Sequence, residues 1–371
     1  MPERTTRDSP VHDDVRPVRS DRARGGGRGG VRSGSRWAPV RLIGARVLGA
    51  RLIGARVLGA RVLGARLIGA RVLGALGVLW LVATLTFFAV RLIPGDPAQA
   101  ILGGPGSQAS AAALAAARAE YGLDQPLFMQ YLAQLGRLAT GDLGRSYALN
   151  MDVAPLVLSQ LGGTLLLAFL ALALAWLIAL SLAMWSTRGG VIALRIGSGL
   201  EIVAAALPHF WLATSLIVVF SIWWGVLPPI STSGAVGLIL PVLTLAIPLA
   251  GFLGQLMRES LLTALESPFV LSARARGESE RGVRWVHALR HAALPAINLS
   301  GWAFGSLISG AVVVETIFAR PGLGRTLLNA VTIRDVPVVV GVVMIVALAY
   351  IAMTILTDLA ARIADPRVRT S

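Results

Sequence analysis

Long apolar stretches alternate with shorter polar ones along most of the chain. A helix needs roughly 20 predominantly apolar residues to cross the hydrocarbon core of a membrane. Six stretches meet this requirement: Val72–Leu92, Gly163–Trp185, Gly199–Trp223, Val236–Met257, Ala296–Phe318 and Val338–Ile363. Pro241 and Pro248 interrupt the fourth, but neighbouring helices satisfy the carbonyls that a proline frees inside a membrane. The pattern therefore predicts an all-α, polytopic membrane protein with six transmembrane helices.

The N-terminal polar region has two parts. Residues 1–40 are rich in Arg and Gly, so a disordered tail is expected. Residues 41–75 repeat the unit Arg-(Leu/Val)-(Ile/Leu)-Gly-Ala seven times. Arginines five apart step about 500° around a helix and spiral, which argues against an amphipathic surface helix. Two interpretations stay open: contact with anionic lipid headgroups, and repeat expansion or an upstream start codon in the coding sequence, which is favoured.

The distribution of arginine predicts the orientation. All 34 basic residues are arginines. If the N-terminus lies inside, the inside segments hold 27 of them and the outside segments hold 7. Because cytoplasmic loops carry the excess of basic residues, both termini are expected in the cytoplasm. The net charge of +15 thus reflects topology and not a nucleic-acid partner. The first span begins too late for a cleavable signal peptide, so an uncleaved signal anchor is expected.

Composition excludes several kinds of chemistry. Charged residues are 14% of the chain and hydrophobic ones 55%, whereas soluble domains carry about 25% charge. The sequence has no cysteine, and its four histidines lack metal-ligand spacing. Without lysine it has no phosphate-binding Walker loop, so it is not the ATPase of a system that uses one. We expect a non-catalytic chain that binds no metal or cofactor.

The segment between the fourth and fifth spans carries the most information. It runs from Arg258 through Gly277 to Leu294-Pro295, with helix-forming Ala and Arg residues before the glycine and an amphipathic pattern after it. This pattern predicts two short helices along the membrane face, hinged at Gly277. Small side chains at Ala273 and Ala275 would form a knob that a partner approaches closely, with nearby arginines engaging acidic residues on it.

These residues resemble the coupling-loop signature of binding-protein-dependent ABC importer permeases, most closely the dipeptide/oligopeptide/nickel subfamily. In that family the loop docks in a cleft of the ATPase subunit. Leu271 replaces an acidic residue of the general family pattern, which the peptide-type subfamily commonly lacks too. The resemblance implies an ATPase-coupling role for Ser272, Ala273, Arg274, Ala275, Arg276, Gly277, His287, Arg290, Leu294 and Pro295.

Further stretches resemble the same subfamily in order, over about residues 75–365. They are Pro94–Pro97, Tyr121–Leu127, Gln130-Tyr131, Gly141–Gly144 with Ser146, Trp224–Pro228, Glu315–Arg325 and Arg334–Pro337. One departure is the run Ser159–Thr164, which lacks the usual basic residue and proline.

Six residues are candidates for a role in the translocation pathway or its gating. Five lie at the end of the fifth span or just after it, and one lies at the kink of the third span: Glu315, Phe318, Pro321, Gly322, Gly324 and His209. Ionisable residues in spans are functional candidates. For Glu315 a structural role near the interface is an equal alternative. For His209, which follows Pro208, a ring satisfied by a neighbouring helix carbonyl is favoured.

The resemblance implies an ABC type I importer permease fold, with residues 72–160 forming the first helix and an extracytoplasmic region, 161–364 the permease domain and 365–371 a cytoplasmic tail. It implies a bacterial inner-membrane location within the lipid bilayer and no nucleic-acid partner. The expected partners are a second permease subunit that is a homologue of this one, two ATPase subunits that use ATP and Mg²⁺, and a solute-binding protein. Peptides are the favoured substrates, beside nickel chelates, glutathione and some sugars.

Two other classes of membrane protein are alternatives. A secondary transporter often shows inverted repeats and midplane acidic groups, and a membrane-embedded enzyme needs clustered polar residues at depth. Neither feature is visible in the sequence. Neighbouring genes for an ATPase and a binding protein would distinguish the importer from both.

Overall fold

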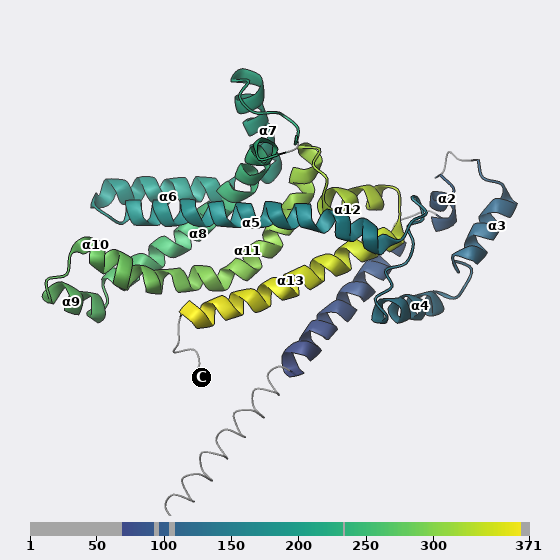
Figure 1. The fold of residues 1–371 in the computed structure, drawn as a ribbon, viewed down its shortest axis with the longest axis horizontal. Coiled ribbons are helices and arrows are strands. Elements are labelled where there is room, and N and C mark those ends of the chain that lie inside the picture. Colours follow the sequence, from purple (N-terminus) through teal and green to yellow (C-terminus); the bar gives the residue numbers. More distant parts are fainter. Residues whose placement is uncertain (1–68, 93–95, 104–107, 233, 365–371) are drawn as a thin grey trace, which may run out of the picture. The chain divides into compact units, whose positions relative to one another are not determined.

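The computed structural model describes residues 69–92, 96–103, 108–232 and 234–364 (Figure 1). The predicted tail 1–40, the repeat up to residue 68 and the predicted tail 365–371 lie outside the described residues. Within the described residues the regular elements are helices, with one isolated antiparallel bridge between Arg145 and Asp152. The prediction of an all-α fold is confirmed.

Five helices are long and apolar enough to cross a membrane. They are the first helix Gly69–Leu92, α5 (Val153–Ser186), α8 (Val236–Leu265), the run Glu280–Ile317 that ends in α11 (Leu289–Ile317), and α13 (Val336–Ala364). Each contains most of a predicted span, and α5 and α8 extend well beyond theirs. Pro241, Pro248 and Pro295 all lie inside helices, as is tolerated where neighbouring helices surround the chain.

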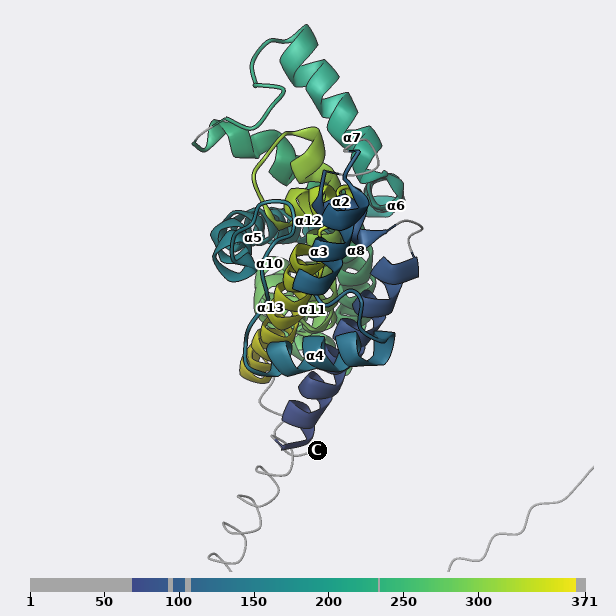
Figure 2. The same cartoon turned by 90° about the vertical axis from the view of Figure 1, so that its right-hand side faces the viewer.

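The third predicted span is not one straight helix. Residues Gly190–Ala206 form α6, and α7 (His209–Leu216) continues into a π-helical segment, η1 (Ile217–Trp223). The two halves are bent by 101°. Leu207, with φ −71° and ψ 120°, is extended because Pro208 disfavours the helical conformation at the residue before it. In both views α7 points away from α6 (Figures 1 and 2). The third predicted span is therefore a bent pair of helices, with its bend at the expected kink beside Pro208.

Helix α8 lies at the centre of the packed helices, in contact with α5, α6, α7 and α11. Alanines of α5 and leucines of α8 are fully buried in this core, among them Ala171, Ala175, Leu245 and Leu253. A Cβ at Gly251 would lie 2.5 Å from the backbone N of Ala205. Small residues thus bring the helix backbones into close contact, which is how membrane helices gain packing energy.

Short helices lie at the two ends of these long ones (Figure 1). At one end are α9 (Pro268–Ala275) and α10 (Glu280–Gly282), which we call the loop end. At the other end are α2 (Pro97–Ile101), α3 (Ala111–Glu120), α4 (Leu127–Ala139) and α12 (Leu323–Thr332), which we call the clasp end. Helices α5 and α13 run from the clasp end to the loop end, and α11 runs back.

Candidate functional site

The predicted coupling loop is a compact turn between α8 and α11. Ser267 precedes Pro268 at the first position of α9, where the missing N–H of proline costs no helical hydrogen bond. The helix ends at Ala275, and Gly277 follows with φ +82°, a left-handed conformation that glycine adopts readily. The Ser279 hydroxyl then accepts from the backbone N–H of Gly282 at 3.2 Å and caps α10. The predicted hinge position thus lies in the turn that follows α9.

The second arm of this loop is not a separate helix. Through α10 and the π-helical segment η2 (Val283–Ala288), it runs without a break into α11. The prediction of two independent short helices is thus corrected, because no turn residue interrupts the chain after Gly282. The loop and α11 therefore share one continuous helical run, Glu280–Ile317.

A small apolar core holds the loop together. Val270, Ala273 and Val283 are fully buried there, with Leu265 packed against them. Ala273 therefore faces inward and does not belong to a knob presented to a partner. Ser272 and Ala275 are exposed, and the Ser272 hydroxyl donates to the Pro268 carbonyl at 2.9 Å.

Ion pairs close the turn around Gly277. The Arg274 guanidinium contacts both carboxylate oxygens of Glu280, at 2.8 and 3.2 Å. The His287 ring Nε2 lies 2.7 Å from Glu278 Oε2. Arg274 and His287, both predicted to couple to the ATPase, thus have partners inside the loop. Arg276 and Arg290 are exposed, and Leu294 and Pro295 lie half-buried on α11.

Large apolar side chains are exposed on both parts of the coupling loop, on α9 before Gly277 and on η2 after it. Leu271 on α9 is 57% exposed, and Trp285 on η2 is 50% exposed. Phe269 and Val286 are exposed beside them along the chain. We call these four residues the loop apolar set. An internally tied loop that leaves such side chains uncovered has the character of an interaction surface.

A second cluster of predicted residues gathers at the clasp end. The carboxylate of Glu315, fully buried, accepts from the Thr164 hydroxyl at 2.6 Å and from the backbone N–H groups of Gly324 at 2.8 Å and Arg325 at 3.2 Å. Thr164 Oγ1 in turn accepts from Leu323 N at 2.8 Å. The carboxylate thereby caps the N-terminus of α12, where helix N–H groups and dipole favour an anion. We call this arrangement the Glu315 clasp; it joins α5, α11 and α12.

Two predicted glycines make the clasp possible. A Cβ at Gly322 would lie 2.2 Å from the carboxyl carbon of Glu315, and one at Gly324 would lie 2.5 Å from Val312 Cα. Phe318 is buried, and its carbonyl accepts from Ser231 N at 2.7 Å. Pro321, by contrast, is exposed.

His209 lies apart from the clasp, against α11 at Gly310, where an added Cβ would be 3.3 Å from its Nε2. Among the described residues no group hydrogen-bonds its ring. The favoured expectation of a helix carbonyl partner is therefore wrong for this structure.

A polar groove of about 730 Å³ borders the clasp. Its lining comes from α5, from the segment before α8 and from the turn after α11. The polar lining residues are Ser159, Gln160, Ser231, Thr232 and Arg320, with Pro321 beside them. Sequence analysis did not find this groove, since its residues come from three distant segments.

Two further acidic side chains are buried, and the sequence did not predict their partners. Glu201 on α6 pairs with Arg258 on α8 at 2.7 Å, and both side chains are largely shielded from solvent. Asp335, just before α13, accepts from the Ser146 hydroxyl and from the N–H groups of Tyr147 at 3.1 Å and Ala148 at 3.2 Å. Both acids tie helices or loops together, so their geometry is that of structural anchors.

Comparison with known proteins places this arrangement in a family. Residues 175–370 match the family described as "Binding-protein-dependent transport system inner membrane component", and residues 65–168 match its N-terminal companion. The chain belongs to this family. It is the permease component of an importer, a membrane subunit that is not itself catalytic and whose ATPase is a separate subunit. The suspected resemblance is confirmed.

The permease has several curated relatives. A putative peptide transport system permease protein of Brucella abortus (strain 2308) is 36% identical over 314 residues, which cover 80% of this chain and 96% of that protein. The glutathione transport system permease protein GsiC of Salmonella choleraesuis (strain SC-B67) is 34% identical over 295 residues, covering 78% and 94%.

Solved structures give weaker likenesses. An amino acid ABC transporter matches with a TM-score of 0.43 and 21% identity, over 58% of this chain and 94% of that one. An inward-facing MetNI methionine ABC transporter matches with a TM-score of 0.46 and 18% identity, over 56% and 96%. Within the described residues no group of three or more His, Cys, Asp or Glu side chains is placed to hold a metal ion.

Proposed function

We propose that this permease forms half of the translocation pathway of an ATP-driven importer for peptides or similar small solutes. The observation that carries the proposal is the coupling loop, which is tied internally by Arg274–Glu280 and His287–Glu278 yet leaves its apolar set uncovered. Such a loop fits a rigid element that docks on a separate ATPase subunit. The names of the relatives, which refer to peptide and glutathione transport, support the substrate class.

The remaining partners follow from the same proposal. Two ATPase subunits would bind and hydrolyse ATP with Mg²⁺, and a solute-binding protein would deliver the substrate. Apolar side chains on α7 and η1, including Phe210, Trp211 and Trp223, are exposed and suit contact with lipid or with a second permease subunit. The arginine distribution supports a bacterial inner-membrane location with both termini, and therefore the loop end, in the cytoplasm.

A mechanical link between the loop and the clasp end supports the coupling role. The helical run Glu280–Ile317 has 38 residues, so at about 1.5 Å per residue it reaches roughly 57 Å. Its first residues lie in the loop and its last turn holds Glu315 beside the polar groove. In our proposal a displacement of the docked loop tilts this rod. The Glu315 clasp, with Phe318, Pro321, Gly322 and Gly324, then moves at the groove, and His209 follows through its packing on α11.

Coexpression of tagged permease with its partner subunits tests the proposal. Leu271→Asp places a charge in the loop apolar set, whereas Leu149→Asp changes an equally exposed leucine at the clasp end. Because neither side chain is buried, both variants should fold. We expect Leu271→Asp to reduce the amount of ATPase subunit that copurifies, and Leu149→Asp to leave it unchanged.

Two results would contradict the proposal. Undiminished copurification with Leu271→Asp would remove the loop from the ATPase interface. If no ATPase associates with the unmodified permease and uptake persists without ATP, the importer proposal fails and a secondary transporter takes its place.

A further inference from the structure

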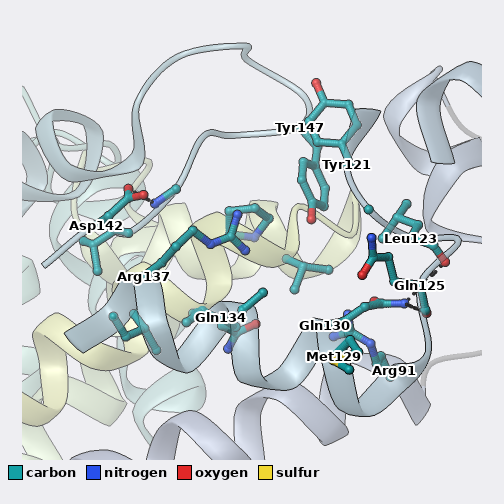
Figure 3. A pocket seen from close by; sticks show the side chains of 18 of the residues that line it. Arg91, Tyr121, Leu123, Gln125, Met129, Gln130, Gln134, Arg137, Asp142 and Tyr147 are labelled. Carbon is teal, nitrogen blue, oxygen red and sulfur yellow. Dashed lines mark hydrogen bonds between the residues drawn. The ribbon is translucent and has the colours of Figure 1, made fainter. Parts of the chain in front are cut away.

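A pocket of about 310 Å³ lies at the clasp end, apart from the Glu315 clasp and the polar groove (Figure 3). The last turn of the first helix, the turn after α3, helix α4 and the start of α13 form its walls. It shares no lining residue with the groove beside the clasp. The family assignment gives this pocket no role.

The inner side of the pocket carries a positive charge without an acidic partner. Arg91 Nη2 donates to the Gln130 side-chain oxygen at 2.5 Å, and its guanidinium carbon lies 3.6 Å from the centre of the Phe87 ring. Both partners are neutral. Arg91 Nη1 is buried and has no hydrogen-bond partner among the described residues, and the same holds for Gln134 Nε2. Because a buried charge is destabilising unless an opposite charge compensates it, this wall favours an anion nearby.

A second arginine faces the same space. Figure 3 shows the Arg137 side chain extending from α4 towards the middle of the pocket, with the Tyr121 and Tyr147 rings close together above it. Within the described part of the chain, the Arg137 side chain has no ion pair or hydrogen bond. The Tyr121 and Tyr147 rings pack edge to face, with their centres 4.9 Å apart, and line the pocket beside Arg137.

The acids on the lining do not neutralise these arginines. Asp142 uses a carboxylate oxygen to accept from Gly144 N at 2.8 Å, and Glu120 is exposed. Neither forms an ion pair with Arg91 or Arg137. Burial raises the pKa of the neighbouring Tyr147 phenol, against the influence of Arg137 and Arg91, so the phenol is neutral near pH 7 and adds no negative charge. The two arginines of the pocket therefore have no acidic partner among the described residues.

The pocket lies at the level of the lipid headgroups. Arg91 is next to the last residue of the first apolar helix, and Val336, Pro337 and Val340 belong to the first turns of α13. Both spans therefore end at the pocket, where the hydrocarbon core gives way to the polar interface. Helix α4 exposes Leu127, Phe128 and Leu132, as a helix lying in the interface plane does.

From this geometry we infer that the pocket binds a phosphate group, held by Arg91 and Arg137. Guanidinium groups suit phosphate because their fork of N–H donors matches two phosphate oxygens. Gln134 Nε2, which is buried without a partner among the described residues, lies on the same lining and is a further donor within reach of a small side-chain movement. The phosphate comes either from a phospholipid headgroup at this depth or from free phosphate in solution.

Native mass spectrometry of the full-length permease, purified in mild detergent, tests the lipid source. Arg137→Gln removes the exposed pocket arginine, and the double variant Arg91→Gln/Arg137→Gln removes both. Arg145→Gln is the matched control, because Arg145 is an exposed arginine outside the pocket whose side chain donates to the Asn150 carbonyl and to no other described residue. Loss of a charge-assisted contact should lower retained phospholipid about tenfold in Arg137→Gln and leave the control unchanged.

The second source is tested on delipidated permease with inorganic phosphate. If phosphate raises the thermal unfolding midpoint of the unmodified chain and of Arg145→Gln, but not of Arg137→Gln, the site takes free phosphate. Equal lipid retention in all variants, together with no phosphate effect that depends on Arg137, overturns the inference. Arg137→Gln decides the outcome even if the Arg91 substitution disturbs folding, because the Arg137 side chain is exposed.

Discussion

The Glu315 clasp makes a quantitative prediction about stability. Substituting Glu315→Ala removes an acceptor for three donors, the Thr164 hydroxyl and the N–H groups of Gly324 and Arg325. Hydrogen bonds to a charged group contribute about 1.5–3 kcal/mol each, but they are not additive when they share one acceptor. The substitution also leaves buried donors without partners at a helix N-terminus. We therefore expect a loss of about 3–5 kcal/mol, typical of removing one member of a buried charged network.

Two companion variants separate charge from shape. Glu315→Gln keeps the volume and one carbonyl oxygen but offers an NH₂ group towards the Thr164 hydroxyl, so about 1–2 kcal/mol should be lost. Gly322→Ala places a Cβ 2.2 Å from the carboxyl carbon of Glu315, so it should displace the carboxylate without changing any charge. Thr164→Ser keeps the hydroxyl and is the control that should change least.

Thermal unfolding in detergent, followed as the monodisperse fraction after heating, measures these effects. A loss of this size should lower the midpoint for Glu315→Ala by on the order of 10 °C, with Glu315→Gln and Gly322→Ala in between. An unchanged midpoint in Glu315→Ala would refute the clasp as a stabilising element. Normal midpoints combined with lost uptake would instead assign Glu315 to the pathway itself.

The other predictions concern the remaining anchors. Gly251→Val should sharply reduce the folded yield on fluorescence-detected size exclusion, because its Cβ meets the α6 backbone at 2.5 Å, whereas Gly199→Val, at an open position, should not. Arg258→Ala should lower the unfolding midpoint more than the conservative Arg258→Lys, since it leaves Glu201 buried without its partner; equal midpoints would argue against the pair. Asp335→Asn should increase proteolysis near Tyr147, because the amide cannot accept from all three donors of the loop, and an unchanged digestion rate would contradict this.

Apolar periodicity predicted the membrane helices well, and a kink was expected beside Pro208 in the third, but the size of the bend, 101°, was not predicted. Runs such as that of α13 are long and uninterrupted, so their existence follows from length alone. Pro208, Pro241, Pro248 and Pro295 all interrupt apolar runs, yet only at Pro208 does the chain turn. Tertiary packing decides which proline bends a helix, and a single sequence does not contain that information.

Sequence motifs predicted which segments form the candidate site. They did not predict the contacts of these segments, because the partners lie far apart in the sequence. The break between helices at Gly277, predicted as a hinge, follows from the sequence because a glycine after a helix-forming run is a strong local signal. The partner of Glu315, Thr164, is 151 residues away, and the link between Ser146 and Asp335 spans 189 residues. The charge pattern of the loop contained one usable signal, since Glu280 follows Arg274 closely, but its pairing requires the turn at Gly277 to be known first.

The central claim is that the loop end docks on a separate ATPase, and the absence of native cysteine allows a direct test. Ala275→Cys introduces a single thiol at an exposed position of the loop, and Ala148→Cys introduces one at an exposed position of the clasp end. In membranes that contain the partner subunits, a short thiol cross-linker should join the chain bearing Ala275→Cys to the ATPase subunit, in a yield that changes with ATP. Ala148→Cys should give no such product. Equal cross-linking from both positions, or none from Ala275→Cys, would contradict the account.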